Sequence, residues 1–210
     1  MTQGPPAEHE HPALHHADLD SDPLAQCRAW LREAETAGVA LANAIALATT
    51  GADGEPTVRH VLLREITPEG FTFFTNLESR KARDLSENAR AAFTVFWREL
   101  DRQISVRGRV EPLAPERSDA YFATRPRDAQ LGAWASDQSR PLEDRATLER
   151  RVEEARSRFA GGDVPRPAHW GGFLLIPDEV ECWQGRPFRL HDRFRYTRAG
   201  SGWRLERLYP

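Results

Sequence analysis

Short segments with strand character, separated by turn residues, dominate the chain from Ala44 to Val110 and constrain the fold more than any other feature. Apolar or β-branched runs are interrupted by the turns Gly51-Ala-Asp-Gly54 and Pro68-Glu-Gly70, a pattern typical of an antiparallel meander. The predicted strands cover residues 44–48, 57–66, 71–75, 91–97 and 102–111, with a short helix over 79–88. Closely spaced strands of this kind favour a small barrel.

Helices flank the predicted barrel. Asp22 can cap a helix that begins with Pro23 and ends at Gly38, because Asp and Pro suit the first helical positions. Further helices are predicted over 115–124 and 142–159, and further strands over 172–176, 179–184, 188–196 and 203–208. The expected fold class is therefore mainly β with flanking helices.

One folded domain is expected from the length of 210 residues. Residues 1–20 are rich in Pro, His, Glu and Ala without periodicity, so they predict a flexible N-terminal arm before a domain over 21–210. The arm contains His9, His11, His15 and His16, but no scaffold fixes them there. We predict no metal site.

Composition excludes several classes of function. A mean hydropathy of -0.63 and no apolar run near the ~20 residues that span a bilayer argue against a membrane protein, and the start of the chain is no secretory signal, which predicts a cytoplasmic setting. A net charge of -3 gives no support to a nucleic-acid partner. Cys27 and Cys182 form no CxxC motif and are predicted to be buried small hydrophobes. Rossmann, P-loop, serine-hydrolase and zinc motifs are absent from the sequence.

Cations stand at two unusual places. Ser79 is a good N-cap, yet Arg80 and Lys81 follow it in the first helical turn, where the helix dipole disfavours positive charge. A phosphate would resolve this conflict, although both side chains could simply point into water. Arg59 and Arg64 bracket a segment that looks buried on both faces, roughly 16 Å apart at ~3.3 Å per residue. Two anionic groups, one on a cofactor and one on a substrate, would fit them, as would exposure to solvent.

A third group of basic side chains lies near the C-terminus. Period-two alternation would place Arg189, His191 and Arg193 on one strand face, an arrangement that an anionic or electron-rich ligand would stabilise. The same alternation would turn Phe188, Leu190 and Phe194 toward the core. An ordinary half-solvated strand is the alternative.

Aromatic residues and one further arginine leave their roles open. Tyr121 and Arg125, four residues apart on a helix, could grip a phosphate or form a surface pair. Trp134, Trp170 and Trp183 are predicted to be core residues, although a tryptophan can also flank a planar ring.

Taken in order and spacing, these segments resemble the pyridoxine/pyridoxamine 5'-phosphate oxidase family. The resemblance runs from about Asp20 to Pro210 and rests on Arg59 to Arg64, Phe74-Thr75, Ser79-Arg-Lys81, Gln103, Arg125-Pro-Arg-Asp128, Gly132-Ala-Trp134, Gln138-Ser139, Trp170-Gly-Gly172, Trp183-Gln-Gly185 and Arg189-Leu-His-Asp-Arg193. It implies an FMN-binding split β-barrel that forms a homodimer with FMN at the interface.

The resemblance also implies site residues. FMN would be held by Arg59, His60, Val61, Leu62, Leu63, Arg64, Phe74, Thr75, Arg80, Lys81 and Gln103 of one chain and by Gln138, Ser139, Trp183 and Arg193 of the other. The substrate would be held by Arg64, Tyr121, Arg125, Ala129, Arg189, Leu190 and His191, with Arg189 and His191 as catalytic residues that orient the pyridine ring or handle a proton.

The implied reaction is oxidation of pyridoxine or pyridoxamine 5'-phosphate to pyridoxal 5'-phosphate, with O2 as acceptor, H2O2 as product and ammonia released from the amine. Three departures bear on the substrate: Arg64 stands where many members have lysine, Ala129 stands where a serine often contacts phosphate, and the arm lacks an Arg and Tyr pair that covers the substrate in some relatives. An oxidase of another heterocycle, similar to the phenazine-biosynthesis oxidases, and a flavin- or pyridoxal-phosphate-binding barrel without turnover are the alternatives.

Overall fold

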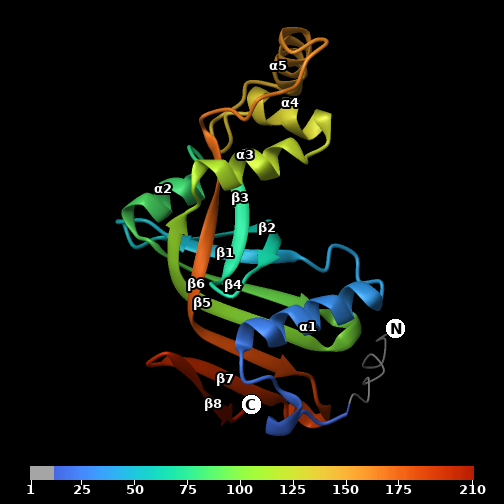
Figure 1. Cartoon of the computed structure of the whole chain (residues 1–210), viewed down its shortest axis with the longest axis vertical. Helices are drawn as coiled ribbons and strands as arrows, with labels where there is room; N and C mark the ends of the chain where they lie inside the picture. The colour runs from blue at the N-terminus through green and yellow to red at the C-terminus, as the bar shows by residue number, and fades with distance from the viewer. Residues whose placement is uncertain (1–11) are drawn as a thin grey trace, which may run out of the picture.

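Six antiparallel strands close into a barrel because one long strand, β6, pairs with both β5 and β3. The computed structural model describes residues 12–210, and Figure 1 shows the barrel with β7 and β8 continuing the sheet beyond β6. The strands are β1 Ala44–Thr50, β2 Pro56–Ile66, β3 Phe71–Asn76, β4 Arg90–Trp97, β5 Arg102–Pro112, β6 Trp170–Gln184, β7 Asp192–Ala199 and β8 Gly202–Leu208. The order around the sheet is β3-β2-β1-β4-β5-β6-β7-β8, so the predicted mainly β barrel is confirmed.

Helices cover the barrel wall and one of its ends. They are α1 Pro23–Thr36, α2 Arg80–Glu87, α3 Pro115–Ala123, α4 Arg127–Ala135 and α5 Arg145–Arg158, with short 3-10 turns at His16–Asp18, Arg98–Leu100 and Pro187–Arg189. Figure 1 shows α3, α4 and α5 stacked into a lobe that projects from one end of the barrel, while α1 lies beside the other half. Within residues 12–210, no helix is long and apolar enough to cross a membrane.

The main core fills the barrel and the space beneath α1. Inward-facing side chains alternate along β1 and β4, so Ile45 and Leu47 are buried while their neighbours are less so. Phe71 meets Phe93 edge to face at 5.0 Å between ring centroids. α1 contributes Cys27, which is 1% exposed, and Cys182 of β6 is also buried. The prediction that both cysteines are buried is confirmed.

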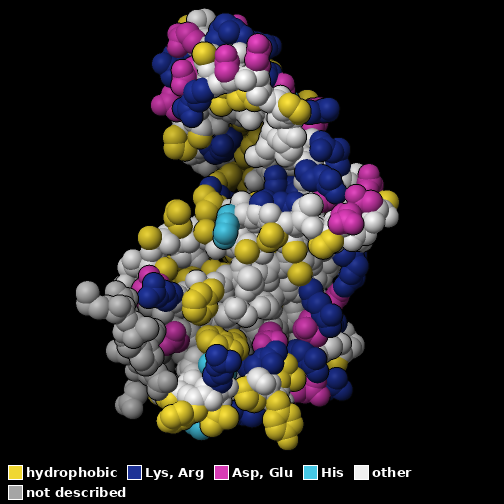
Figure 2. Space-filling model, turned by 180° about the vertical axis from the view of Figure 1, so that it is seen from behind, with side chains coloured by type: hydrophobic (Ala, Val, Ile, Leu, Met, Phe, Trp, Pro, Cys, Tyr) yellow, Lys and Arg dark blue, Asp and Glu magenta, His cyan; other side chains and the backbone are white. Residues whose placement is uncertain are grey.

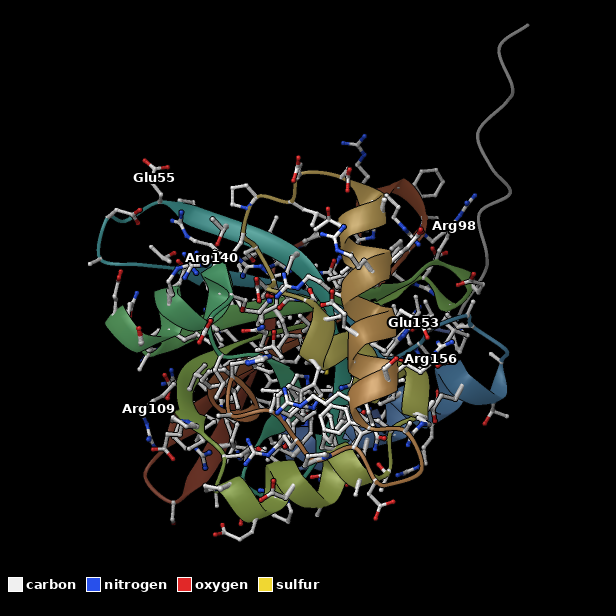
Figure 3. All side chains as sticks on the ribbon, turned by 90° about the horizontal axis from the view of Figure 1, so that it is seen from above. Glu55, Arg98, Arg109, Arg140, Glu153 and Arg156 are labelled. Atoms are coloured by element: carbon white, nitrogen blue, oxygen red, sulfur yellow. The ribbon has the colours of Figure 1, made fainter. Side chains whose placement is uncertain are left out.

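A second, smaller core holds the helical lobe together. Phe122, Leu131, Ala155, Val164 and Trp170 form it. On the outer surface of α5, which Figure 3 shows from above with Glu153 and Arg156 labelled, Arg156 pairs with Asp128 of α4 at 3.4 Å. Such exposed pairs contribute about 0–1 kcal/mol, so the apolar contacts dominate the packing of the lobe.

Several predicted elements have different bounds in the structure. The helix α4 was not predicted, because its sequence, Arg127–Ala135, follows the preceding helix after only three residues. The strands predicted over 172–176 and 179–184 are one strand, β6, which continues past Pro177 through a register shift opposite Gly108. A side chain at Gly108 would place its Cβ 2.1 Å from the Ile176 carbonyl oxygen, so only glycine permits this close approach.

The strand β2 is less covered than the sequence suggests. Between Arg59 and Arg64, only Leu63 is buried and His60 is exposed, so the prediction of burial on both faces of this run is wrong for the single chain. Leu63 belongs to the barrel core, whereas His60, Val61 and Leu62 line a cavity.

The described part of the predicted N-terminal arm is attached to the barrel. Leu14 is 7% exposed, its N–H donates to Asp192 Oδ2 at 3.0 Å, and its carbonyl accepts from Arg207 Nη2 at 2.8 Å. The Tyr196 hydroxyl donates to the Asp20 carbonyl at 2.7 Å. His9 and His11 lie outside the described residues. Residues 12–20 therefore follow the β7–β8 surface.

Candidate active site

A cavity of about 720 Å³ lies between the barrel and the helical lobe, within the range usual for small-molecule sites. Its lining residues come from β2, β3, α2, α3, α4, β6 and the loop after α4: Arg59, His60, Val61, Leu62, Arg64, Phe74, Thr75, Asn76, Arg80, Lys81, Tyr121, Arg125, Ala129, Gly132, Ala133, Ser136, Gln138, Ser139 and Trp170. Figure 2 shows Lys and Arg side chains gathered at the waist between the lobe and the barrel.

Lys81 forms the most buried cationic group of the cavity wall. It is 6% exposed, and its Nζ donates to Thr75 Oγ1 at 3.0 Å, Ser79 Oγ at 3.1 Å and Gln138 Oε1 at 3.0 Å. All three partners are neutral, and burial, reinforced by Arg59, lowers the Lys81 pKa to about 8. An anion would offset this desolvated charge, so Lys81 does not point into water.

Ser79 occupies the N-cap position of α2 but does not cap the helix with its side chain. Its hydroxyl accepts from Lys81 instead, so the expectation of a side-chain cap is wrong. The backbone N–H groups of the first turn are therefore left to other partners, one of which is Ser139 Oγ, which accepts from the Arg80 N–H at 3.3 Å.

Beside Lys81, a buried carboxylate organises two arginines. Asp84 of α2 is 3% exposed and accepts from Arg80 Nε at 2.7 Å. Its second oxygen accepts from the hydroxyls of Thr49 at 2.7 Å and Thr57 at 2.8 Å, and lies 3.8 Å from Arg59 Nη2. Sequence analysis missed Asp84 because a lone Asp within a short helix carries no motif.

Aromatic rings build the opposite wall. Phe74 stacks on Tyr121 at 4.1 Å and on Trp170 at 5.3 Å, with interplanar angles of 19° and 7°. The Arg64 guanidinium lies 5.5 Å from the Tyr121 ring centroid. Trp170, predicted as core, is buried in the lobe and also lines the cavity.

Arg125 lies against this aromatic wall. Its guanidinium is 4.8 Å from the Trp170 ring centroid and 5.4 Å from that of Phe122. Its Nη1 is buried without a hydrogen-bond partner among the described residues, and burial lowers the pKa of the guanidinium. A buried donor without a partner is costly, and an anionic ligand would satisfy it.

The cavity gathers most of the residues that the sequence assigned to the cofactor and the phosphate of the substrate. From the predicted cofactor set it contains Arg59, His60, Val61, Leu62, Arg64, Phe74, Thr75, Arg80, Lys81, Gln138 and Ser139, and from the predicted substrate set Arg64, Tyr121, Arg125 and Ala129. Leu63 instead points into the barrel core.

Gln138 and Ser139 were expected to reach the cofactor from a second chain. The structure places both in the same chain's cavity, because the loop after α4 returns to the start of α2. Ser139 adopts a φ of 72° in this loop. The structure therefore places both residues beside α2 of their own chain, and which subunit's cofactor they contact stays a prediction.

The remaining predicted site residues form a second group, on β5, β6, β7 and the segment before β7, that does not line the cavity. Gln103 is the cross-strand neighbour of Trp183, whose ring lies 4.6 Å from that of His191. Arg193 forms two hydrogen bonds with Glu181, at 2.7 and 3.0 Å. The Arg186 N–H donates to His191 Nδ1 at 3.1 Å, so a neutral His191 carries its proton on Nε2.

Arg189 and Leu190 precede β7 rather than belonging to it. Phe188 and Arg189 have φ values of 60° and 62°, so the chain turns here. Phe188 is 85% and Leu190 67% exposed, so the predicted core-facing alternation over 188–194 is wrong for both. Phe194, inside β7, is buried as expected.

The closed six-strand barrel with a cationic, aromatic-walled cavity defines the class: split-barrel flavoproteins. Residues 31–159 match the family model "Pyridoxamine 5'-phosphate oxidase", and residues 170–210 match "Pyridoxine 5'-phosphate oxidase C-terminal dimerisation region". The chain therefore belongs to the pyridoxamine 5'-phosphate oxidase family. It is an oxidoreductase and a flavoprotein.

Individual relatives agree with this assignment. The chain is 51% identical over 199 residues to a pyridoxine/pyridoxamine 5'-phosphate oxidase of Cupriavidus pinatubonensis, with 94% of this chain and 93% of the relative covered. It is 49% identical to the protein of the same name from Gluconobacter oxydans, with 92% and 96% covered. Among solved structures, PhzG from Burkholderia lata 383 in complex with tetrahydrophenazine-1-carboxylic acid is similar, with a TM-score of 0.91, 33% identity, and 97% of this chain and all (100%) of that chain covered.

Proposed function

We propose that this protein oxidises pyridoxine 5'-phosphate or pyridoxamine 5'-phosphate to pyridoxal 5'-phosphate, using FMN and O2. The observation that carries the proposal is the presence of two separate cationic groups in one cavity. Arg80 and Lys81 of α2 form one group with Arg59 of the neighbouring strand β2, whereas Arg64 and Arg125 lie on the aromatic wall. A flavin phosphate and a substrate phosphate are two anions that would fit these two groups.

The residues around Lys81 fit the FMN phosphate. Lys81 is a desolvated ammonium with neutral partners, and the first-turn N–H groups of α2 add the positive end of a helix dipole. Bound FMN would accept a hydride from the substrate carbon that bears the amine or alcohol, and its reoxidation by O2 would give H2O2. The protein supplies the position of each phosphate and a sheltered cavity.

The residues around Arg125 fit the substrate phosphate. Arg125 Nη1 needs a partner, and the phenol of Tyr121 and the guanidinium of Arg64 border the same space. Arg64 offers a planar fork of donors, which suits a phosphate oxygen pair. Ala129 also lines this part of the cavity but offers no side-chain donor, so the arginines would carry the phosphate contact.

A homodimer would complete the site. Trp183, Arg189, Leu190, His191 and Arg193 stand outside the cavity of their own chain, and Gln103 lies on the same surface. We propose that this surface faces the cavity of a second subunit, as the family of the C-terminal region suggests. The Nε2–H of the partner subunit's His191 and the guanidinium of the partner's Arg189 would then orient the substrate ring.

A second candidate is the oxidation of another anionic heterocycle. Its support is the likeness to the structure of PhzG in complex with tetrahydrophenazine-1-carboxylic acid. Arg64 and Arg125 would pair with a carboxylate as well as with a phosphate. The two candidates differ in whether the substrate needs a phosphate group.

Anaerobic mixing of the FMN-loaded protein with each substrate separates these candidates. Under the first proposal, pyridoxine 5'-phosphate or pyridoxamine 5'-phosphate bleaches the flavin absorbance, and air restores it. Pyridoxine, which lacks the phosphate, reacts far more slowly. Bleaching by tetrahydrophenazine-1-carboxylic acid alone would favour the second candidate. Bound flavin that no substrate reduces would indicate a binding protein without turnover.

A further inference from the structure

The buried carboxylate of Asp84 contacts Arg59 and Arg80, two of the cations that line the cavity beside Lys81. Asp84 uses both oxygens: Oδ1 accepts from Arg80 Nε, and Oδ2 accepts from two threonine hydroxyls. At 3% exposure, this carboxylate would be expensive to bury without such partners. The hydrogen bonds from Thr49, Arg80 and Thr57 outweigh desolvation, so the pKa of Asp84 lies below its ordinary value.

The contacts of Asp84 join three elements that border the cavity. Thr49 belongs to β1, Thr57 and Arg59 to β2, and Arg80 to α2. Arg59 is fixed further, because its Nη1 donates to Thr49 Oγ1 at 2.7 Å and to the Leu47 carbonyl at 3.3 Å. Hydrogen bonds and ion pairs within the protein therefore fix the guanidinium groups of Arg59 and Arg80.

We propose that Asp84 is a positioning residue that sets Arg59 and Arg80 in the geometry that binds the phosphate of the flavin. This inference rests on the proposed function, which places that phosphate beside Lys81. Asp84 itself does not line the cavity, so it would act through the two arginines rather than by contact.

Two opposite effects of Asp84 on an anion make the proposal testable. A negative charge close to a phosphate repels it, so an Asp84 that served only to balance charge would weaken binding, and its neutralisation would strengthen it. A positioning role gives the opposite sign, because free arginines must be ordered when the phosphate binds. Asp84 also raises the Lys81 pKa, which keeps more of the ammonium charged.

A matched control exists in the same cluster. Asp53 pairs with the same guanidinium, at 3.2 Å from Arg80 Nη2, but its side chain is 53% exposed. Asp84→Asn and Asp53→Asn each remove one negative charge that pairs with Arg80. The two carboxylates differ in burial, and only Asp84 contacts Thr49 and Thr57. An effect of net charge alone would therefore appear in both variants.

The experiment measures dissociation constants for FMN and for riboflavin, which lacks the phosphate, by quenching of flavin fluorescence in the full-length, flavin-free protein. We expect the wild type to prefer FMN. Asp84→Asn should weaken FMN binding about tenfold, in line with the loss of about one charge-assisted hydrogen bond, while riboflavin binding stays within about twofold. Asp53→Asn should leave both constants within about twofold.

Three outcomes would overturn the inference. Unchanged or tighter FMN binding in Asp84→Asn would show that the carboxylate does not position the arginines. An equal loss for FMN and riboflavin would indicate a general structural role. A wild type that binds both flavins equally would instead remove the proposed phosphate site, and the role of Asp84 with it.

A second variant covers a failure of Asp84→Asn to fold. Thr57→Val keeps every charge and suits a strand, but removes the hydroxyl that donates to Asp84 and accepts from Arg59 Nη2. It should weaken FMN binding about threefold with riboflavin unchanged, less than Asp84→Asn, because the carboxylate keeps its charge and its contacts to Thr49 and Arg80. Equal binding of FMN by this variant and the wild type would count against the proposal.

Discussion

Replacement of Arg125 by Met should separate substrate binding from stability. The guanidinium lies over two rings, yet its buried Nη1 has no hydrogen-bond partner within residues 12–210. Met preserves an unbranched apolar stem in contact with Trp170 and Phe122 while removing the charge. If Arg125 serves the substrate phosphate, the variant loses binding without losing much stability.

The expected magnitudes follow from these contacts. Hydrogen bonds to charged groups contribute about 1.5–3 kcal/mol, so loss of the arginine should raise the half-saturating concentration of pyridoxine 5'-phosphate about 100-fold. For stability, removal of a buried unpartnered donor relieves about 1–3 kcal/mol, while loss of two cation–π contacts costs about 0.5–1 kcal/mol each. The net change should keep Tm within about 4 °C of the wild type.

The assay follows the rate of anaerobic flavin bleaching against substrate concentration, together with thermal unfolding of the flavin-free protein. Arg127→Met is the matched control. Arg127 starts α4 and donates to the Phe159 carbonyl at 2.6 Å and the Gly162 carbonyl at 2.8 Å, outside the cavity. Its loss should lower Tm by a few degrees, roughly 1–3 kcal/mol for two hydrogen bonds, and leave substrate saturation unchanged.

Two results would refute this reasoning. Unchanged substrate saturation in Arg125→Met would show that the unpartnered guanidinium does not serve the substrate. A fall in Tm of more than about 8 °C would show that Arg125 is chiefly a structural residue of the lobe.

Three further predictions concern pH, assembly and thiol chemistry. In the folded, flavin-free protein the Lys81 pKa is about 8, below the usual lysine value of 10.5, so the free energy of unfolding should rise with pH between those values, which denaturant titration can check. FMN affinity should fall over the same range as Lys81 loses its proton, which fluorescence quenching can check. If each site combines two subunits, co-expression of Arg125→Met with His191→Ala should give mixed dimers in which one of the two sites has both residues. Activity should then recover to at most about a quarter of the wild-type value, whereas no recovery would contradict the shared site. Cys27 and Cys182 are buried and burial raises both thiol pKa values, so a thiol reagent should modify neither before unfolding and both after it; rapid native labelling would contradict their burial.

The sequence by itself determined the local elements whose signals are short-range. Asp22, Pro23 and Gly38 bound α1 as predicted, and the Asp22 carboxylate accepts from the Leu24 and Ala25 N–H groups. Turn residues and period-two alternation likewise located β1 to β5, because these signals act within a few residues. The sequence also identified Arg80 and Lys81 as cations that call for an anion.

Tertiary structure decided what depends on contacts between distant segments. Pro177 looked like a strand end, but pairing with β5 and the missing side chain of Gly108 let β6 continue. The apolar alternation over 188–194 predicted a strand, yet the positive φ values of Phe188 and Arg189 turn the chain there.

The site shows the same division. Charge and spacing picked out the cations of the cavity wall, and the family resemblance supplied most of its other lining residues, but neither showed which of them come together in one chain. Gln138 reaches Lys81 across 57 positions of sequence, and Asp84 meets Thr49 across 35. Only closure of the barrel by β6 and the return of the loop after α4 bring these groups within hydrogen-bond distance. Such contacts join segments that are far apart in the sequence, whereas turn and periodicity signals act only within a few residues.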